Sequence, residues 1–103
     1  MKKTDLMMGL IFFSLTMFAM SANAADIEAG KAKSMACTSC HGANGISSSP
    51  MIPNLAGQKA AYLAKAIRDF KTGERKNGMM SSVVGMIADS DIDNVAAYFA
   101  SMK

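Results

Sequence analysis

Apolar positions recur with a helical period in two well-separated stretches of the chain. In residues 58–73 the apolar side chains fall at positions 62, 63, 66, 67 and 70. Gly73 is a natural C-terminal stop for this helix. In residues 88–103, aspartates cluster at the N-terminal end, and the i, i+3, i+4, i+7 pattern is made by Ile92, Val95, Ala96 and Phe99. Each stretch therefore predicts an amphipathic helix, and the second has its charges where the helix dipole favours them.

A third stretch, residues 26–40, is rich in helix-compatible residues and starts with a good capping residue. Asp26 is a plausible N-cap, and Glu28 follows it in the first turn. Gly30 within this stretch costs about 1 kcal/mol relative to alanine, so we expect it to mark a close packing contact. The chain shows no convincing strand pattern. The periodicity alone therefore predicts an all-α fold with three helical stretches.

Two segments between the helices read as loops. Residues 42–58 contain both prolines and three successive serines, which are typical of a loop. Residues 72–90 mix glycine with methionine, valine and isoleucine, so we expect a loop that covers something apolar. No internal repeat divides the chain, and 103 residues suffice for one domain at most.

The first 24 residues carry the three parts of a secretory signal peptide. Two lysines follow the initial methionine, residues 6–20 form an almost uncharged apolar run, and residues 21–24 end in a small-x-small pattern. A retained membrane anchor is the alternative, although spanning a bilayer takes about 20 apolar residues. We expect cleavage after Ala24, export to the periplasm without stable membrane insertion, and a single domain over residues 25–103.

Removal of the signal peptide changes the net charge and the length of the mature chain. Two lysines and one aspartate are lost, so the formal net charge falls from +3 to about +2. A charge this small, without a basic stripe or an arginine-rich run, does not indicate binding to nucleic acid or to anionic membranes. Taking 24 from 103 residues leaves 79, a length at which a domain usually needs a disulfide, a metal or a bound group for stability.

All cysteine and histidine of the chain lies in one short motif, "CTSCH", which runs from Cys37 through Cys40 to His41. A disulfide between the two cysteines would close a very small loop and add little stability. A thioredoxin-like redox pair normally follows a strand in a βαβ pattern, which this chain lacks. Zinc requires four protein ligands, or three and a water, and the chain has no second pair of Cys or His residues.

The fourth interpretation, covalent attachment of haem, accounts for all three side chains. Cys-x-x-Cys-His is its sequence signature: each thiol forms a thioether to the haem, and the histidine is an axial ligand of the iron. One helical turn brings Cys37 and Cys40 to one porphyrin edge. We therefore expect one covalent haem c with His41 as a metal ligand. Since His41 is the only histidine, the opposite face of the iron has methionine, lysine or an exogenous ligand, or is open.

Further motifs surround this segment in a specific order: Gly30 ahead of "CTSCHG", then "PNLAGQKAAYL", "FKTGERKN", "MM" and "SDIDNVAAYF". With them the chain resembles a class I cytochrome c of the small periplasmic monohaem type, and one domain of the dihaem bacterial cytochromes c. The resemblance covers essentially all of residues 25–103. It implies the class I cytochrome c fold, in which three to five helices wrap around one haem. The first and last helices would cross where Gly30 lets an aromatic, Tyr98 or Phe99, come close.

The resemblance also implies how the iron ligands are held. The carbonyl of Pro53 would accept a hydrogen bond from the ring N–H of His41, which fixes the ring and raises its basicity. The sixth ligand would be a methionine from the segment before the last helix. The family spacing selects Met80, and its competitors are Met79 and Met86.

Other side chains are candidates for contact with the haem. Gln58, Tyr62 and Arg75 could hydrogen-bond a propionate, although Arg75 could equally be a solvated surface residue. Sequence cannot separate haem contacts from core for the apolar candidates, which besides Tyr62 are Leu55, Leu63, Ile67, Phe70, Val83, Val84 and Ile87.

An iron with histidine on one side and methionine on the other has no free position for a substrate. The resemblance therefore implies an electron carrier and not an enzyme, which shuttles single electrons between periplasmic redox proteins. Two alternatives remain. The chain could be a haem c subunit of a larger redox enzyme complex, or a ligand-binding or sensor haem if the methionine is labile.

Overall fold

The computed structural model describes residues 24–103, and within this range it is helical with no strand, which confirms the all-α prediction. The predicted signal peptide lies outside the described residues except for Ala24. No helix within residues 24–103 has the length and apolar character needed to cross a membrane. In chain order the helices are α1 (Ile27–Lys33), α2 (Met35–His41), α3 (Ala60–Thr72), α4 (Gly78–Val84), the short 3-10 helix η1 (Asp89–Asp91) and α5 (Ile92–Ala100).

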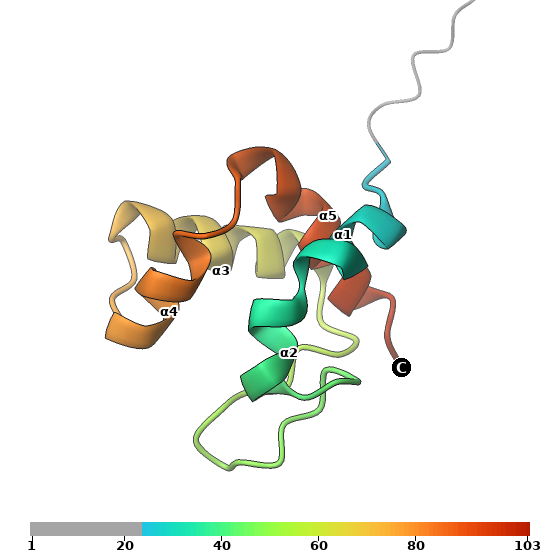
Figure 1. The fold of residues 1–103 in the computed structure, drawn as a ribbon, viewed down its shortest axis with the longest axis horizontal. Coiled ribbons are helices and arrows are strands. Elements are labelled where there is room, and N and C mark those ends of the chain that lie inside the picture. The colour runs from blue at the N-terminus through green and yellow to red at the C-terminus, as the bar shows by residue number, and fades with distance from the viewer. Residues whose placement is uncertain (1–23) are drawn as a thin grey trace, which may run out of the picture.

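The stretch 26–40, predicted as one helix, forms two helices that meet at a break. Asp26 caps α1 as predicted, because its side chain accepts a hydrogen bond of 3.1 Å from the Ala29 N–H. Ser34 ends α1: it is 2% exposed, and its hydroxyl donates to the carbonyl of Lys31 at 2.8 Å. Figure 1 shows α2 leaving α1 in a new direction at this point. The prediction of a single helix was therefore wrong.

The stretch 72–90 was predicted as a loop, and this was wrong because it contains α4 and η1. Asn77 caps α4, and its side-chain oxygen accepts hydrogen bonds from the N–H groups of Met79 and Met80. The helix packs against α3. Glycine, serine and valine make up most of its sequence, and these are weak helix formers. The cap and the packing therefore override the local sequence preference.

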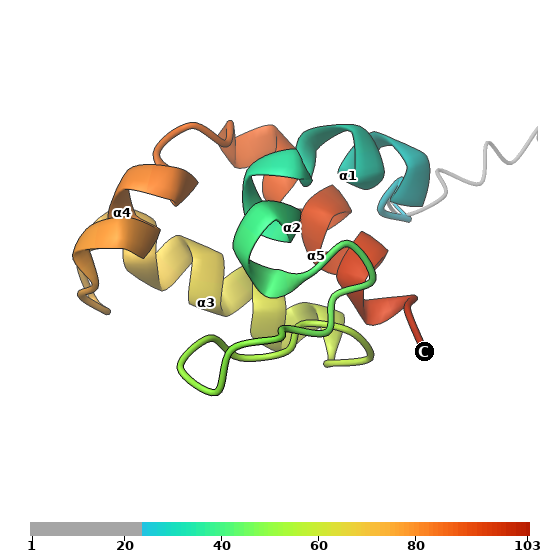
Figure 2. The same cartoon turned by 60° about the horizontal axis from the view of Figure 1, so that its bottom comes forward.

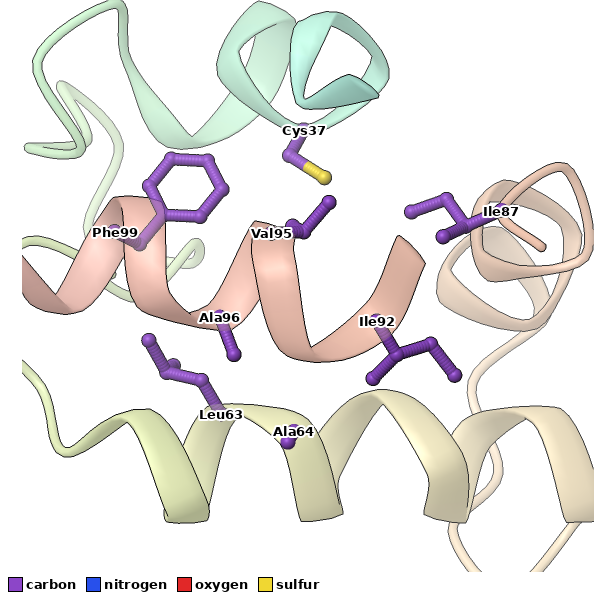
Figure 3. Close-up of a cluster of buried hydrophobic side chains, with 8 residues drawn as sticks. All are labelled: Cys37, Leu63, Ala64, Ile87, Ile92, Val95, Ala96 and Phe99. Carbon is purple, nitrogen blue, oxygen red and sulfur yellow. The ribbon is translucent and has the colours of Figure 1, made fainter. Parts of the chain in front are cut away.

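The core forms around α5, which lies between α1 and α2 on one side and α3 on the other (Figures 1 and 2). Figure 3 shows Val95 and Phe99 pointing toward Cys37 of α2, while Ile92 and Ala96 point toward α3. The apolar period predicted for residues 88–103 is thus divided between two neighbouring layers. The buried cluster consists of Cys37, Leu63, Ala64, Ile87, Ile92, Val95, Ala96 and Phe99.

Gly30 makes the crossing of α1 and α5 close. A Cβ atom at Gly30 would lie 1.9 Å from the carbonyl oxygen of Asn94 and 3.0 Å from Cβ of Tyr98. The Asp26 N–H also donates to the side-chain oxygen of Asn94 at 2.8 Å. The expected close approach is therefore present. Tyr98 is the aromatic beside the glycine, whereas Phe99 is buried in the core.

Candidate functional site

A largely apolar cavity of about 300 Å³ is the candidate site. Helix α2 contributes Cys37 and His41 to its lining, and α4 contributes Met80 and Val84. Side chains from α3, α5 and the 42–59 segment complete the walls, together with Arg75, Asn77 and Ile87. The cavity therefore unites residues that are far apart in the sequence, including Cys37, His41 and Met80, whose side chains carry metal-binding atoms.

His41 is buried, with 6% of its surface exposed, and its ring is held by one hydrogen bond. The distance from its Nδ1 atom to the carbonyl oxygen of Pro53 is 2.7 Å. A carbonyl can only accept, so Nδ1 must carry the proton. In the neutral ring the Nε2 atom then has a free lone pair, which is the form of histidine that binds a metal. The Pro53 carbonyl thus fixes the tautomer that coordination requires.

The two cysteines lie one helical turn apart on α2, which places them on the same face of the helix. Cys37 is 8% exposed and lines the cavity, whereas Cys40 is exposed to solvent. Burial raises the pKa of the Cys37 thiol above its ordinary value. The two thiols are not joined to each other. Within residues 24–103, no group of three or more His, Cys, Asp or Glu side chains is placed to hold a metal ion.

The three candidate methionines have different surroundings. Met80 is partly buried and lines the same cavity as His41. Met79 is 66% exposed and Met86 is 72% exposed, and neither is part of the lining. Neighbouring residues of an α-helix point about 100° apart, so only one of Met79 and Met80 can face the cavity at a time.

The three polar residues proposed for the propionates, Gln58, Tyr62 and Arg75, all line the cavity. The Gln58 side-chain amide donates to the carbonyl of Asn54 at 2.6 Å. Tyr62 is 51% exposed. The guanidinium carbon of Arg75 lies 4.7 Å from the ring centre of Phe70, a cation–π contact that brings its positive charge to the cavity.

The cavity lining differs in part from the set of candidate residues. Val83 was a candidate, but it is not part of the lining. The other apolar candidates do line the cavity, as do Met51 and Asn77, which sequence reasoning missed. For Met51 the sequence offers no signal, because it lies in a loop and is 87% exposed. For Asn77 there was a signal: asparagine is a preferred N-cap, and it stands directly before Gly78 and the two methionines.

Comparison with known proteins decides the family. The sequence pattern of the cytochrome c family matches residues 27–103. The chain belongs to the cytochrome c family. Membership confirms the predicted covalent c-type haem, and it places the chain in a family of electron carriers. The cavity fits this group, because it combines apolar walls with a buried His41 whose Nε2 is free to coordinate and with the thiol of Cys37.

A solved structure shows that the likeness extends to the fold. The crystal structure of reduced cytochrome c4 from Pseudomonas stutzeri matches this chain with a TM-score of 0.72 and 39% sequence identity. The match covers 78% of this chain and 47% of that chain. The class I cytochrome c fold predicted from the sequence is thereby confirmed.

Relatives of known function differ in how much of their length this chain spans. Cytochrome c4 from Pseudomonas aeruginosa is 40% identical over 93 residues, which is 90% of this chain and 46% of that protein. Cytochrome c-554(548) from Halomonas halodenitrificans is 39% identical, and its whole length matches 78% of this chain. The cytochrome subunit of sulfide dehydrogenase from Chlorobaculum tepidum is 34% identical over 72% of this chain and 66% of that protein. The chain thus spans about half of cytochrome c4.

Proposed function

We propose that this protein is a periplasmic single-electron carrier whose haem c is held by His41 and Met80 as axial ligands. The observation that carries the proposal is that both side chains line one apolar cavity, while Met79 and Met86 are exposed. The haem supplies an iron centre that accepts and releases one electron. The protein's part is to bind it, orient its ligands and exclude water.

Each of these tasks has its own residues. Cys37 and Cys40 attach the haem covalently from one face of α2. Pro53 holds the ring of His41 in the coordinating tautomer. The apolar walls disfavour the additional charge of oxidised iron, and a thioether ligand favours the reduced state, so both raise the reduction potential. With His41 and Met80 both bound to the iron, no position would be left for a substrate.

The chain would exchange electrons with other periplasmic redox proteins. Cys40 is exposed, so the haem edge attached there would lie near the surface, with the segment 43–52 beside it. Partners of small electron carriers dock through small interfaces and leave again quickly. The periplasmic location follows from the predicted signal peptide in residues 1–24. Secretion also supplies the compartment in which haem is attached to a c-type cytochrome.

The test is the visible spectrum of the purified holoprotein, oxidised and reduced, with and without carbon monoxide. We expect a sulfur-to-iron charge-transfer band in the oxidised form and no response to carbon monoxide. Met80→Ala should lose the band and bind carbon monoxide. Met79→Ala and Met86→Ala are matched controls that should keep the charge-transfer band. Carbon monoxide binding to the unmutated protein would count against the carrier and favour a ligand-binding haem.

A second candidate function is that of a haem subunit within a larger redox enzyme. Two observations favour it: the similarity to the cytochrome subunit of a sulfide dehydrogenase, and large exposed apolar side chains. The most exposed of these are Met35, Met51, Met79 and Met86. Size-exclusion chromatography of a periplasmic extract separates the two functions. A carrier elutes as a small protein, whereas a subunit co-elutes with a much larger assembly.

A further inference from the structure

Two adjacent methionines compete for one position on α4. Met80 lines the cavity and Met79 is exposed. A rotation of this helix by about 100° would exchange them. The two methionines have the same chemistry, so the selection between them comes from the orientation of α4 and from how firmly its first turn is held.

Asn77 caps α4 at this first turn. Its backbone is extended, with φ −159° and ψ 120°, and its side-chain oxygen accepts hydrogen bonds from two backbone N–H groups. These belong to Met79, at 3.1 Å, and Met80, at 3.0 Å, which are the two competing residues. An N–H can only donate, so the amide of Asn77 must present its oxygen to them. The same side chain lines the cavity.

The start of α4 is exposed at Asn77, Gly78 and Met79. The helix has seven residues, and Gly78 opens it. A Cβ atom at Gly78 would meet nothing within 4 Å, so no other segment lies against this side of the residue. The buried anchor of α4 is Val84, 1% exposed, which lies at the C-terminal end of the helix, on the same face as Met80, and lines the same cavity.

We propose that Asn77 is a positioning residue that sets the register of α4, so that Met80 and not Met79 reaches the iron. The inference rests on the proposed ligation by His41 and Met80, and it adds the residue that selects the ligand. Without the cap the first turn would fray, and Met80 would spend more time away from the cavity. Exogenous ligands would then bind the iron more readily, because the binding-competent fraction rises.

The experiment measures imidazole binding to the oxidised holoprotein for Asn77→Ala and for the unmutated chain. Loss of an N-cap should raise the apparent imidazole affinity about fivefold, within a range of about 2-fold to 30-fold. Asn77→Ser keeps a capping oxygen and should restore affinity close to that of the unmutated protein. Asp26→Ala removes the cap of α1, a helix that contributes no residue to the cavity lining, and should leave imidazole affinity unchanged.

The same variants show which methionine coordinates. If Asn77→Ala keeps part of its charge-transfer band, adding Met79→Ala should reduce it, because Met79 then shares the position. Equal imidazole affinity in Asn77→Ala and the unmutated protein, with the band intact in both, would overturn the role of Asn77 alone. Absence of the band from the unmutated protein would overturn the ligation by Met80, and the inference with it. Should Asn77→Ala not fold, Asn77→Gly provides a milder cap removal, with an expected increase smaller than that for alanine but larger than that for serine.

Discussion

The carbonyl oxygen of Pro53 lies 2.7 Å from the Nδ1 atom of His41. Pro53 is 12 positions after His41 in the sequence. The loop that begins after His41 therefore folds back onto the ring of this histidine. The acceptor belongs to the backbone of a residue whose φ angle is fixed by its own ring. The orientation of the buried imidazole is therefore set by a stiff point in an otherwise glycine-rich and serine-rich loop.

Replacing Pro53 with alanine should keep the hydrogen bond to His41, but the backbone at position 53 would lose the stiffness that the proline ring gives it. Alanine offers the same carbonyl, but it allows the unfolded chain more conformations, so we expect a loss of about 0.4–1 kcal/mol in the free energy of unfolding. Denaturant titration of the holoprotein measures this loss. The charge-transfer band should remain, and its disappearance would mean that the proline also places the ligand.

Gly30→Ala should weaken the crossing of α1 and α5. The new Cβ would lie 1.9 Å from the Asn94 carbonyl oxygen, so the two helices would have to separate. We expect a loss of about 2 kcal/mol or more in the free energy of unfolding, as for other overpacked sites. Gly78→Ala is the matched control, because nothing lies within 4 Å of its Cβ position and alanine favours the helix. It should be neutral or stabilising by up to about 1 kcal/mol.

Cys40→Ala should leave the haem attached through Cys37 alone. The reduced haem spectrum in alkaline pyridine shifts with the number of thioethers, so the variant should show the one-thioether position and the unmutated protein the two-thioether position. The mass of the denatured variant should still include one haem. An identical pyridine spectrum for the two proteins would mean that Cys40 forms no thioether.

The ion pair between Lys71 and Asp89 should make stability depend on pH in the acid range. Their charged atoms lie 2.7 Å apart, and the hydrogen bond from Lys71 holds the pKa of Asp89 below its ordinary value. A carboxyl with a lowered pKa in the folded state stabilises the fold above its ordinary pKa. This contribution is lost as the pH falls through the lowered value, below about pH 4.

The measurement compares Asp89→Asn with the unmutated holoprotein by denaturant unfolding at pH 6 and again below pH 4. The stability difference should be present at pH 6 and shrink in acid. In a Lys71→Gln background, Asp89→Asn should have a much smaller pH-dependent effect. If the difference between the two proteins stays constant across this range, the pair contributes nothing through the charge of Asp89.

The sequence predicted helix α3 but not helix α4. The apolar period of α3 is strong, and Gly73 at its end adopts the left-handed conformation, with φ 86°, that such a stop requires. Helix α4 has no comparable signal, because it consists mainly of glycine, serine and valine and depends on Asn77 and on packing. The break at Ser34 was also hidden, since serine is tolerated inside helices. Its cause is the burial of that side chain against the preceding turn.

The candidate site was also predictable only in part. The motif of Cys37, Cys40 and His41 predicts covalent haem attachment from the sequence alone, because no other common site uses those residues at that spacing. The methionine could not be chosen from the residues alone, since Met79 and Met80 are chemically identical. Their difference lies in the rotation of α4, which is a property of tertiary structure.

The contact between α1 and α5 joins the two ends of the described chain, since the backbone of Asp26 bonds to the side chain of Asn94 across 68 residues. Closing so long a loop costs chain entropy before any packing between these helices can compensate for it. Contacts of this separation slow folding relative to local ones. A growing chain in which α5 has not yet been synthesised lacks the buried side chains that α5 contributes to the core. The polypeptide therefore cannot complete this core until α5 has been made.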